Sequence, residues 1–209
     1  HSNRELSVVV AAFMDASLYL GKGNAKQEKL TEVATVLGYA AQQNSDLFTG
    51  ICYTQEQITS TPPTKQLYHI EEFSKTLFNA SLLNTSLDHN TAVQDLFKRL
   101  HRPSLLFILS DFLDEIDLSL LSQKHEVIAI IIRDRAEESP KKLGEVTLSH
   151  PHDDQRMETY FGQRSIESYL EKLKESDEKL AEHFTRYDIR SVKIFTDDEV
   201  VSKLVGLFV

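Results

Sequence analysis

The chain contains short, almost uninterrupted apolar runs that alternate with longer amphipathic stretches, and this alternation limits the folds open to it. The runs at 6–14 (LSVVVAAFM) and 127–132 (VIAIII) are rich in β-branched residues and nearly free of polar ones. Continuous runs of this length are typical of strands buried on both faces of a parallel sheet. Because such strands alternate with helical stretches, we expect an α/β fold. Its sheet should be doubly wound and mostly parallel, with helices on both faces.

The order of the expected elements follows from the same patterns. Five runs are expected to form the strands of the main sheet: 6–14, 47–53, 104–109, 127–132 and 191–195. Six stretches carry apolar residues at helical spacing and are expected to form helices: 28–43, 70–78, 91–100, 117–123, 166–187 and 198–207. Two weaker segments, 143–148 and 157–161, flank a polar turn and are expected to form a small β-hairpin insertion. The strands 6–14, 104–109 and 127–132 should be adjacent and interior.

Composition narrows the class of protein further. A length of 209 residues without a repeat or a linker predicts one domain spanning 1–209. A single cysteine, Cys52, excludes an internal disulfide framework and a multi-cysteine zinc site. A net charge of −9 argues against nucleic acid as a partner. The apolar runs fall short of the roughly 20 residues that span a bilayer. We therefore expect no membrane contact within this chain and a cytoplasmic location, or a tether in an N-terminal region that is missing here.

An aspartate closely follows two of the predicted strands. Asp15 comes directly after 6–14, and Asp111 comes two residues after 104–109. In open parallel sheets, functional residues gather at the carboxyl ends of the strands, beside the point where strand order reverses. Two carboxylates with nearby hydroxyl groups are all-oxygen ligands that suit a hard cation such as Mg²⁺. The alternative interpretation is that each aspartate only caps the helix that follows it.

The motifs around these aspartates resemble those of the von Willebrand factor A domain. The segment 6–17 resembles that family's first strand and its D-x-S-x-S metal motif. The segment 90–96 (NTAVQDL) resembles its third element, a threonine that begins a helix and precedes a leucine. The segment 107–111 (FILSD) resembles the aspartate after its central strand. The resemblance implies the same doubly wound, Rossmann-like fold.

A bacterial branch of that family, domain-of-unknown-function family 58, is more closely similar. Its first helix carries K-x-E/Q followed by a Y-A-A segment and an aspartate, as at 26–28 and 39–46, and SDF follows its central strand, as at 110–112. The likeness extends from about residue 6 to residue 208. Members of this branch are typically encoded beside MoxR-type AAA+ ATPases. The resemblance therefore implies such an ATPase, or its client, as the partner, and a role in assembling or activating protein complexes.

The resemblance also implies a metal-ion-dependent adhesion site, a Mg²⁺ site that binds protein partners without catalysis. Carried onto this sequence, its metal residues are Asp15, Ser17, Thr91 and Asp111. Tyr19 stands where the second serine of D-x-S-x-S belongs, and its phenol oxygen projects too far to replace a short hydroxyl group. The expected site is therefore degenerate. We expect Tyr19 and Asp114 to belong to the partner-binding surface.

The alternative function is a Mg²⁺-dependent phosphatase that resembles the haloacid dehalogenases. That family also has a strand ending in an aspartate and a later strand followed by an aspartate pair, which Asp111 and Asp114 imitate. Its first motif is D-x-D, in which the second aspartate is the general acid. Ser17 stands in that position here. Loss of a positioned acid costs about 10²–10⁴ in rate, so the non-catalytic interpretation is preferred.

Three other features are weaker candidates for a site. The segment 149–154 (SHPHDD) is dense in potential metal ligands, and imidazole suits zinc or nickel, but its composition is that of a turn. Cys52 lies within an apolar strand, where a free cysteine is usually inert. The segment 21–23 (GKG) lacks the spacing of a phosphate-binding loop.

Overall fold

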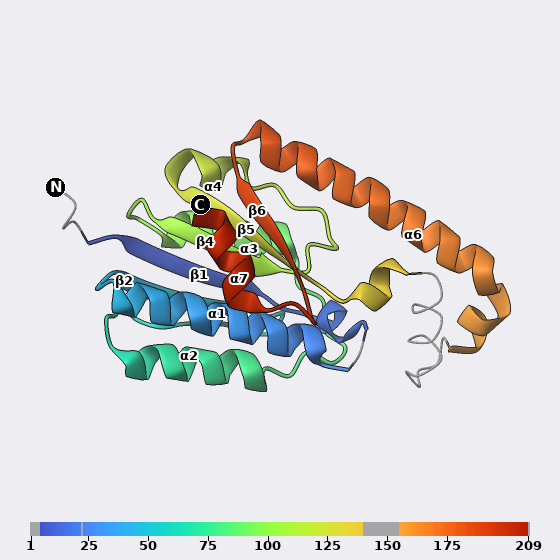
Figure 1. Ribbon diagram of the computed structural model, residues 1–209, viewed down its shortest axis with the longest axis horizontal. Coiled ribbons are helices and arrows are strands. Elements are labelled where there is room, and N and C mark those ends of the chain that lie inside the picture. The colour runs from blue at the N-terminus through green and yellow to red at the C-terminus, as the bar shows by residue number, and fades with distance from the viewer. Residues whose placement is uncertain (1–4, 22, 140–154, 209) are drawn as a thin grey trace.

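The computed structural model describes residues 5–21, 23–139 and 155–208, which build one six-stranded sheet between two layers of helices (Figure 1). The strands lie in the order β3-β2-β1-β4-β5-β6. Neighbouring strands are parallel, except that β3 runs antiparallel to β2. The expected α/β class, with a mostly parallel, doubly wound sheet, is therefore confirmed.

The elements have the following bounds. The strands are β1 Ser7–Phe13, β2 Leu47–Tyr53, β3 Ile58–Ser60, β4 Leu105–Ser110, β5 Glu126–Arg133 and β6 Arg190–Phe195. The α-helices are α1 Ala25–Gln43, α2 Leu67–Asn79, α3 His89–Arg99, α4 Ser119–Lys124, α6 Gln155–Arg186 and α7 Val200–Val205. Short 3₁₀ helices are η1 Ala16–Tyr19, η2 Arg135–Glu138 and η3 Gly206–Phe208.

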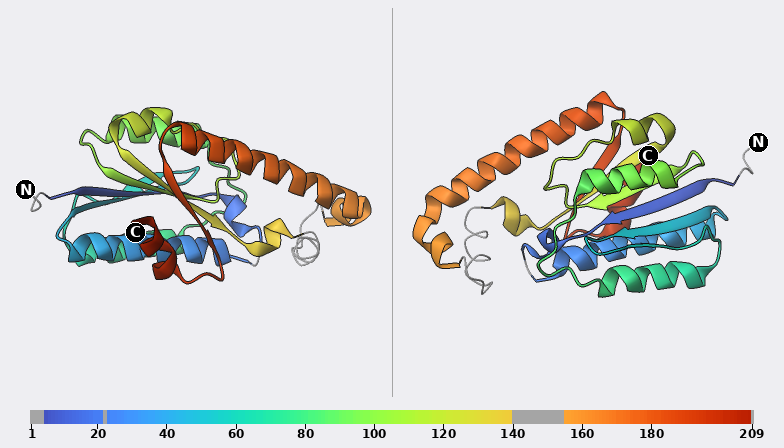
Figure 2. Two further views of the ribbon diagram at one scale, coloured as in Figure 1. Left: turned by 45° about the horizontal axis from the view of Figure 1, so that its top comes forward. Right: turned by 180° about the vertical axis from the view of Figure 1, so that it is seen from behind.

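The central strand β1 shows why the sheet needs a helical layer on each side. Successive side chains of a strand point to opposite faces, and every residue of β1 after its first is buried. Val8, Val10 and Ala12 pack into one core cluster with α1, α2 and α7. Val9, Ala11 and Phe13 pack into a second cluster with α3, α4 and α6. Figure 2 shows the sheet between these two helical layers.

The three apolar runs expected inside the sheet occupy its middle. β1, β4 and β5 are adjacent, with Val10 opposite Phe107 and Phe107 opposite Ile128 in the register. Each has a strand on both sides, so the expectation of three interior strands is confirmed. β3 was not expected. It is a three-residue edge strand with alternating exposure, too short to show in the apolar pattern.

The expected β-hairpin insertion is wrong in its second half. Residues 157–161 lie in α6, which begins at Gln155 and not at residue 166 as expected. The apolar residues Met157, Tyr160 and Phe161 follow the i, i+3, i+4 spacing of a helix, and this spacing continues into the charged helix after them. Residues 143–148, the expected first strand of the hairpin, lie outside the described residues.

Within the described ranges, every helix is too short or too polar to cross a bilayer.

Candidate functional site

The candidate site lies where β1 and β4 end, at the point where the strand order reverses. The chain passes from β1 outward to β2 on one side and returns to place β4 on the other side. Asp15 follows β1, and Asp111 follows β4, so the parallel register brings the two aspartates to the same edge of the sheet. Such a reversal point is where open α/β sheets bind their ligands.

Ser17 joins the two aspartates. Its hydroxyl oxygen lies 2.6 Å from Asp15 Oδ1 and 2.5 Å from Asp111 Oδ2. A hydroxyl group has one proton, so it donates to one of these carboxylates at a time. Asp15 also caps η1, because its Oδ1 accepts from the backbone N–H of Ser17 at 3.0 Å. Its Oδ2 accepts from the backbone N–H of Leu87 at 2.9 Å. Both oxygens of Asp15 therefore hold backbone in place.

A buried lysine supplies the counter-charge of the site. Lys26, in the second position of α1, is fully buried, and its ammonium donates to Asp111 Oδ2 at 3.1 Å and to Glu137 Oε2 at 3.0 Å. Burial by itself would raise the pKa of Asp111, but the Lys26 charge and the hydrogen bond from Ser17 hold that pKa below its usual value. Burial raises the pKa of Glu137, although Lys26 opposes this. Lys26 therefore links the ends of β4 and β5.

Arg133, at the end of β5, fixes the backbone after β4. Its guanidinium donates to the carbonyl oxygens of Asp111 at 2.7 Å and Phe112 at 3.4 Å, and it forms a bidentate pair with Asp177 of α6. Phe112 has a φ of 51°, in the left-handed region that non-glycine residues rarely adopt. The two carbonyl contacts hold this unfavourable turn in place. Arg133 thereby connects α6 to the strand ends.

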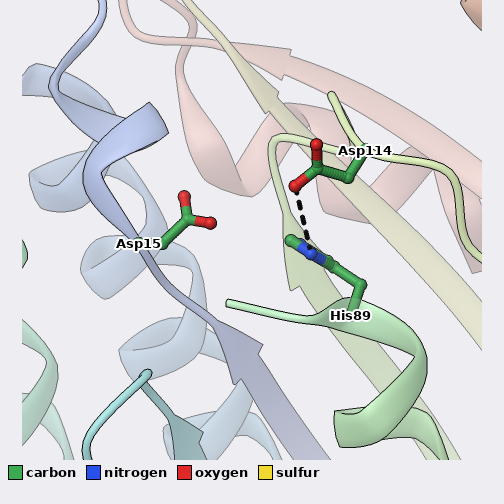
Figure 3. A group of neighbouring side chains, drawn as sticks. All are labelled: Asp15, His89 and Asp114. Carbon is green, nitrogen blue, oxygen red and sulfur yellow. Dashed lines mark ion pairs between the residues drawn. The ribbon is translucent and has the colours of Figure 1, made fainter. Parts of the chain in front are cut away.

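Beside these aspartates lies a second group, Asp15, His89 and Asp114 (Figure 3). One ligand atom of each lies within 4.8 Å of the others. His89 is 4% exposed. Its Nδ1 lies 3.1 Å from the Leu87 carbonyl oxygen and 3.4 Å from Asp114 Oδ2. Its Nε2 lies 3.3 Å from Ser110 Oγ. Partial burial raises the pKa of Asp114, as do nearby carboxylates, while His89 opposes the rise.

The expected metal residues come together only in part. Asp15, Ser17 and Asp111 are in contact, as their positions after the strands predicted. Thr91 lies in the first turn of α3, at the same end of the sheet, but its backbone N–H and its hydroxyl group bond to Asp88. Its place among the metal ligands stays a prediction.

The two residues expected at the partner surface differ in their surroundings. Tyr19 is half-buried, and its phenol oxygen accepts from the backbone N–H of Leu82 at 3.1 Å. It therefore holds the loop that precedes α3. Asp114 has a side chain that is 59% exposed, at the edge of the site and beside His89.

Sequence comparison places the chain in a family. The family described as "Protein of unknown function DUF58" matches residues 1–179, which is most of the chain. The chain belongs to the DUF58 family. No curated protein matches it at a significant level.

A solved structure extends the likeness of this DUF58 chain to the fold. The conserved hypothetical protein BatB from Bacteroides thetaiotaomicron is similar with a TM-score of 0.56 at 10% identity, over 97% of this chain and 96% of that one. At this identity the likeness shows the fold alone. Proximal thread matrix protein 1 from the mussel byssus reaches a TM-score of 0.44 at 11% identity, over 68% of this chain and 41% of that one.

The oxygen atoms that the resemblance assigns to Mg²⁺ are largely engaged with other groups in this DUF58 chain. Asp111 already holds the ammonium of Lys26, and the hydroxyl groups of Thr91 and Tyr19 are bonded elsewhere. A site for Mg²⁺ needs several free oxygen ligands in near-octahedral positions. The residues therefore fit Mg²⁺ poorly as they stand, and magnesium binding stays a prediction.

Lys26, Glu137 and His89 lie in the candidate site but were not expected there from the sequence. Lys26 lies on the buried face of α1, one turn before Leu30, so a charge at that position was the available signal. Its partner Glu137 lies 111 residues away, and a single sequence does not reveal such a pairing. His89 lies two residues before Thr91, directly before the segment 90–96 that carries the threonine motif.

Proposed function

We propose that this chain is a non-catalytic protein-binding module. It presents the ends of β1 and β4, a degenerate form of a metal-ion-dependent adhesion site, to a protein partner. The observation that carries the proposal is the engagement of the charged groups at the centre of the site with one another. Asp111, Lys26 and Glu137 form a buried ion cluster, Asp15 holds backbone in place, and the Ser17 hydroxyl lies between Asp15 and Asp111. These contacts favour a rigid platform.

The same contacts weigh against the phosphatase alternative. A phosphatase of that type needs a free aspartate nucleophile and a second aspartate two residues later as the general acid. Both oxygens of Asp15 accept backbone hydrogen bonds, and Ser17 occupies the acid position. Hydrogen bonds from the backbone N–H groups make the Asp15 carboxylate a weaker nucleophile. This chain therefore fits binding better than phosphoryl transfer.

Exposed groups around the platform are suited to contact a protein. Leu83, in the loop bonded to η1 through Tyr19, is 70% exposed, and Leu20 at the end of η1 is 42% exposed. Asp88 and Asp114 add negative charge at the same strand ends, close to Asp15. Exposed apolar side chains bordered by charges are typical of interaction sites. By the family resemblance, we propose a MoxR-type AAA+ ATPase, or its client, as the partner, with a role in assembling or activating protein complexes.

Binding to the ATPase tests this proposal. The chain is mixed with a MoxR-type ATPase from the same organism, and the dissociation constant is measured. Leu83→Ser should weaken binding by about tenfold or more, as expected when an interface anchor is truncated. Leu120→Ser is the matched control, because Leu120 is 54% exposed on α4, which leads into the opposite end of the sheet.

Two outcomes would overturn the proposal. Equal loss of binding in both leucine variants would show that the strand-end face is not the interface. Turnover of a phosphomonoester in the presence of Mg²⁺, abolished by Asp15→Asn, would show that the chain is an enzyme.

A further inference from the structure

A histidine nitrogen and two carboxylates converge beside the ion cluster, and they differ from the ligand set discussed above. We propose that Asp15, His89 and Asp114 bind a divalent transition metal ion such as Zn²⁺ or Co²⁺. This donor set shares only Asp15 with the one that the family resemblance implies. The proposed ion is also different in kind from Mg²⁺. The inference does not depend on whether the strand-end face binds a protein.

The positions of the three side chains support one shared ion. They come from three separate segments: Asp15 follows β1, His89 begins α3, and Asp114 lies in the loop after β4 (Figure 3). Zinc binds nitrogen and oxygen ligands at about 2.0–2.2 Å in tetrahedral geometry, so two ligands of one ion lie about 3.4 Å apart. The ligand atoms here lie within 4.8 Å of one another. Each pair therefore has to close by at most about 1.4 Å, and the exposed Asp114 side chain can turn toward the ion.

The burial of the group distinguishes it from a chance surface cluster. Asp15 is 5% exposed and His89 is 4% exposed, while Asp114 is open to solvent and provides an entry side for the ion. The His89 ring is held against the Phe13 ring, with the centroids 5.5 Å apart. Two ligands are thus fixed in advance, and the third can close on the ion. This lowers the cost of ordering the site.

The surroundings of His89 allow Nδ1 to act as the ligand. In the metal-free chain Nδ1 faces two acceptors, the Leu87 carbonyl oxygen and Asp114, so Nδ1 carries the proton in that state. When a metal ion replaces this proton, Nε2 carries the ring proton and donates to Ser110 Oγ, 3.3 Å away. A hydrogen bond from the second nitrogen is the usual support of a metal-binding histidine. The Leu87 carbonyl oxygen is then available as a further ligand.

The chemistry of the donors selects the class of metal. Imidazole nitrogen favours zinc, cobalt and nickel, whereas Mg²⁺ prefers oxygen ligands and retains its water. Two carboxylates balance the charge of a divalent ion, and Asp15 Oδ2, which accepts from the Leu87 N–H, keeps a second lone pair for it. The ammonium of Lys26 lies on Asp111, not on Asp15 or Asp114, so it does not occupy these ligands. The site should therefore prefer Zn²⁺ and Co²⁺ over Mg²⁺.

Titration of the metal-free chain tests the proposal. Zn²⁺ and Co²⁺ should raise the melting temperature and Mg²⁺ at the same concentration should not, because an ion that binds only the folded chain stabilises it by RT ln(1 + [M]/Kd). Bound Co²⁺ should show visible absorption bands that report nitrogen and oxygen ligation. His89→Gln and Asp114→Asn should each weaken binding by about 100-fold or more, since even supporting residues of metal sites contribute 10–100-fold. Asp114 is exposed, so its variant folds even if the histidine variant does not.

Two controls separate this site from other histidines. His183→Gln alters the pairing of His183 with Asp117, at 3.9 Å, and should leave the response unchanged. The double variant His150→Ala/His152→Ala removes the histidines of the segment 149–154 and should also leave it unchanged. Loss of the response in that double variant would mean that the ion binds there, and the proposal would be wrong. A response that survives in both His89→Gln and Asp114→Asn, or no response in the wild type, would likewise overturn it.

Discussion

Replacement of Lys26 by methionine should be among the most destabilising single changes at the strand ends. The ammonium lies 3.1 Å from Asp111 and 3.0 Å from Glu137, and the three side chains are at most 3% exposed. Methionine fills a similar volume but leaves two buried carboxylates without a cation. Removing one partner of a buried ion pair costs about 3–5 kcal/mol. Glu137, whose pKa burial already raises, can take up a proton and so limits the loss to this range.

Urea unfolding followed by circular dichroism measures this loss. For a chain of this size, a loss of about 1 kcal/mol in the free energy of unfolding lowers the melting temperature by about 2–4 °C. The melting temperature of Lys26→Met should therefore fall by about 6–20 °C. The loss should shrink as the pH falls below about 4, toward the lowered pKa of Asp111. The lowered pKa of Asp111 stabilises the wild type above the pKa of the unfolded chain, and this contribution disappears when Asp111 is protonated.

A surface lysine provides the matched control. Lys75 is 68% exposed and lies 3.8 Å from Glu72, so Lys75→Met should cost about 0.5 kcal/mol or less. If the free energy of unfolding of Lys26→Met lies within about 1 kcal/mol of the wild-type value at pH 8, the buried cluster does not hold the strand ends together.

Two further changes test other parts of the structure. His125 is buried and its Nδ1 accepts from the backbone N–H of Ser104 at 3.1 Å, so burial lowers its pKa and the wild type should lose stability as the pH falls below about 6.5. His125→Asn keeps an acceptor without titrating, so its free energy of unfolding should fall less between pH 7 and pH 5 than that of the wild type. An equal fall in the two proteins would refute this. Tyr19→Phe removes the acceptor of the Leu82 N–H, so the free energy of unfolding should fall by about 1 kcal/mol and hydrogen exchange at Leu82 should be faster. Unchanged exchange would show that other contacts hold the loop.

The sheet was predictable because burial on both faces leaves a signal in the sequence itself. β1, β4 and β5 consist almost wholly of buried apolar residues, so their position in the middle followed from composition alone. β3 shows the limit of this reasoning, since its Ile58 is 43% exposed and a three-residue edge strand owes its pairing to β2. The segment 157–161 shows another limit, because five residues fit an alternating and a helical pattern equally well.

Residues of the candidate site could be predicted from the sequence only where they closely follow the end of a strand. Asp15 and Asp111 were found because parallel strands bring their carboxyl ends together. Lys26 and Glu137 meet only in the folded chain, 111 residues apart, and local periodicity carries no trace of the pairing. The threonine motif predicted the correct end of the sheet for Thr91. The α3 side chain that lies next to Asp15 and Asp114, however, is His89.

The attachment of α6 has a mechanical consequence. Its 32 residues, at 1.5 Å each, give about 48 Å of helix, which bends near its Gln155 end, and the part toward that end extends beyond the sheet (Figure 1). The pair between Asp177 and Arg133 lies about 33 Å along the helix from that end. The Arg133 guanidinium also holds the carbonyl oxygens of Asp111 and Phe112. A load on the distant end of α6 is therefore passed, in part through Arg133, to the turn that follows β4.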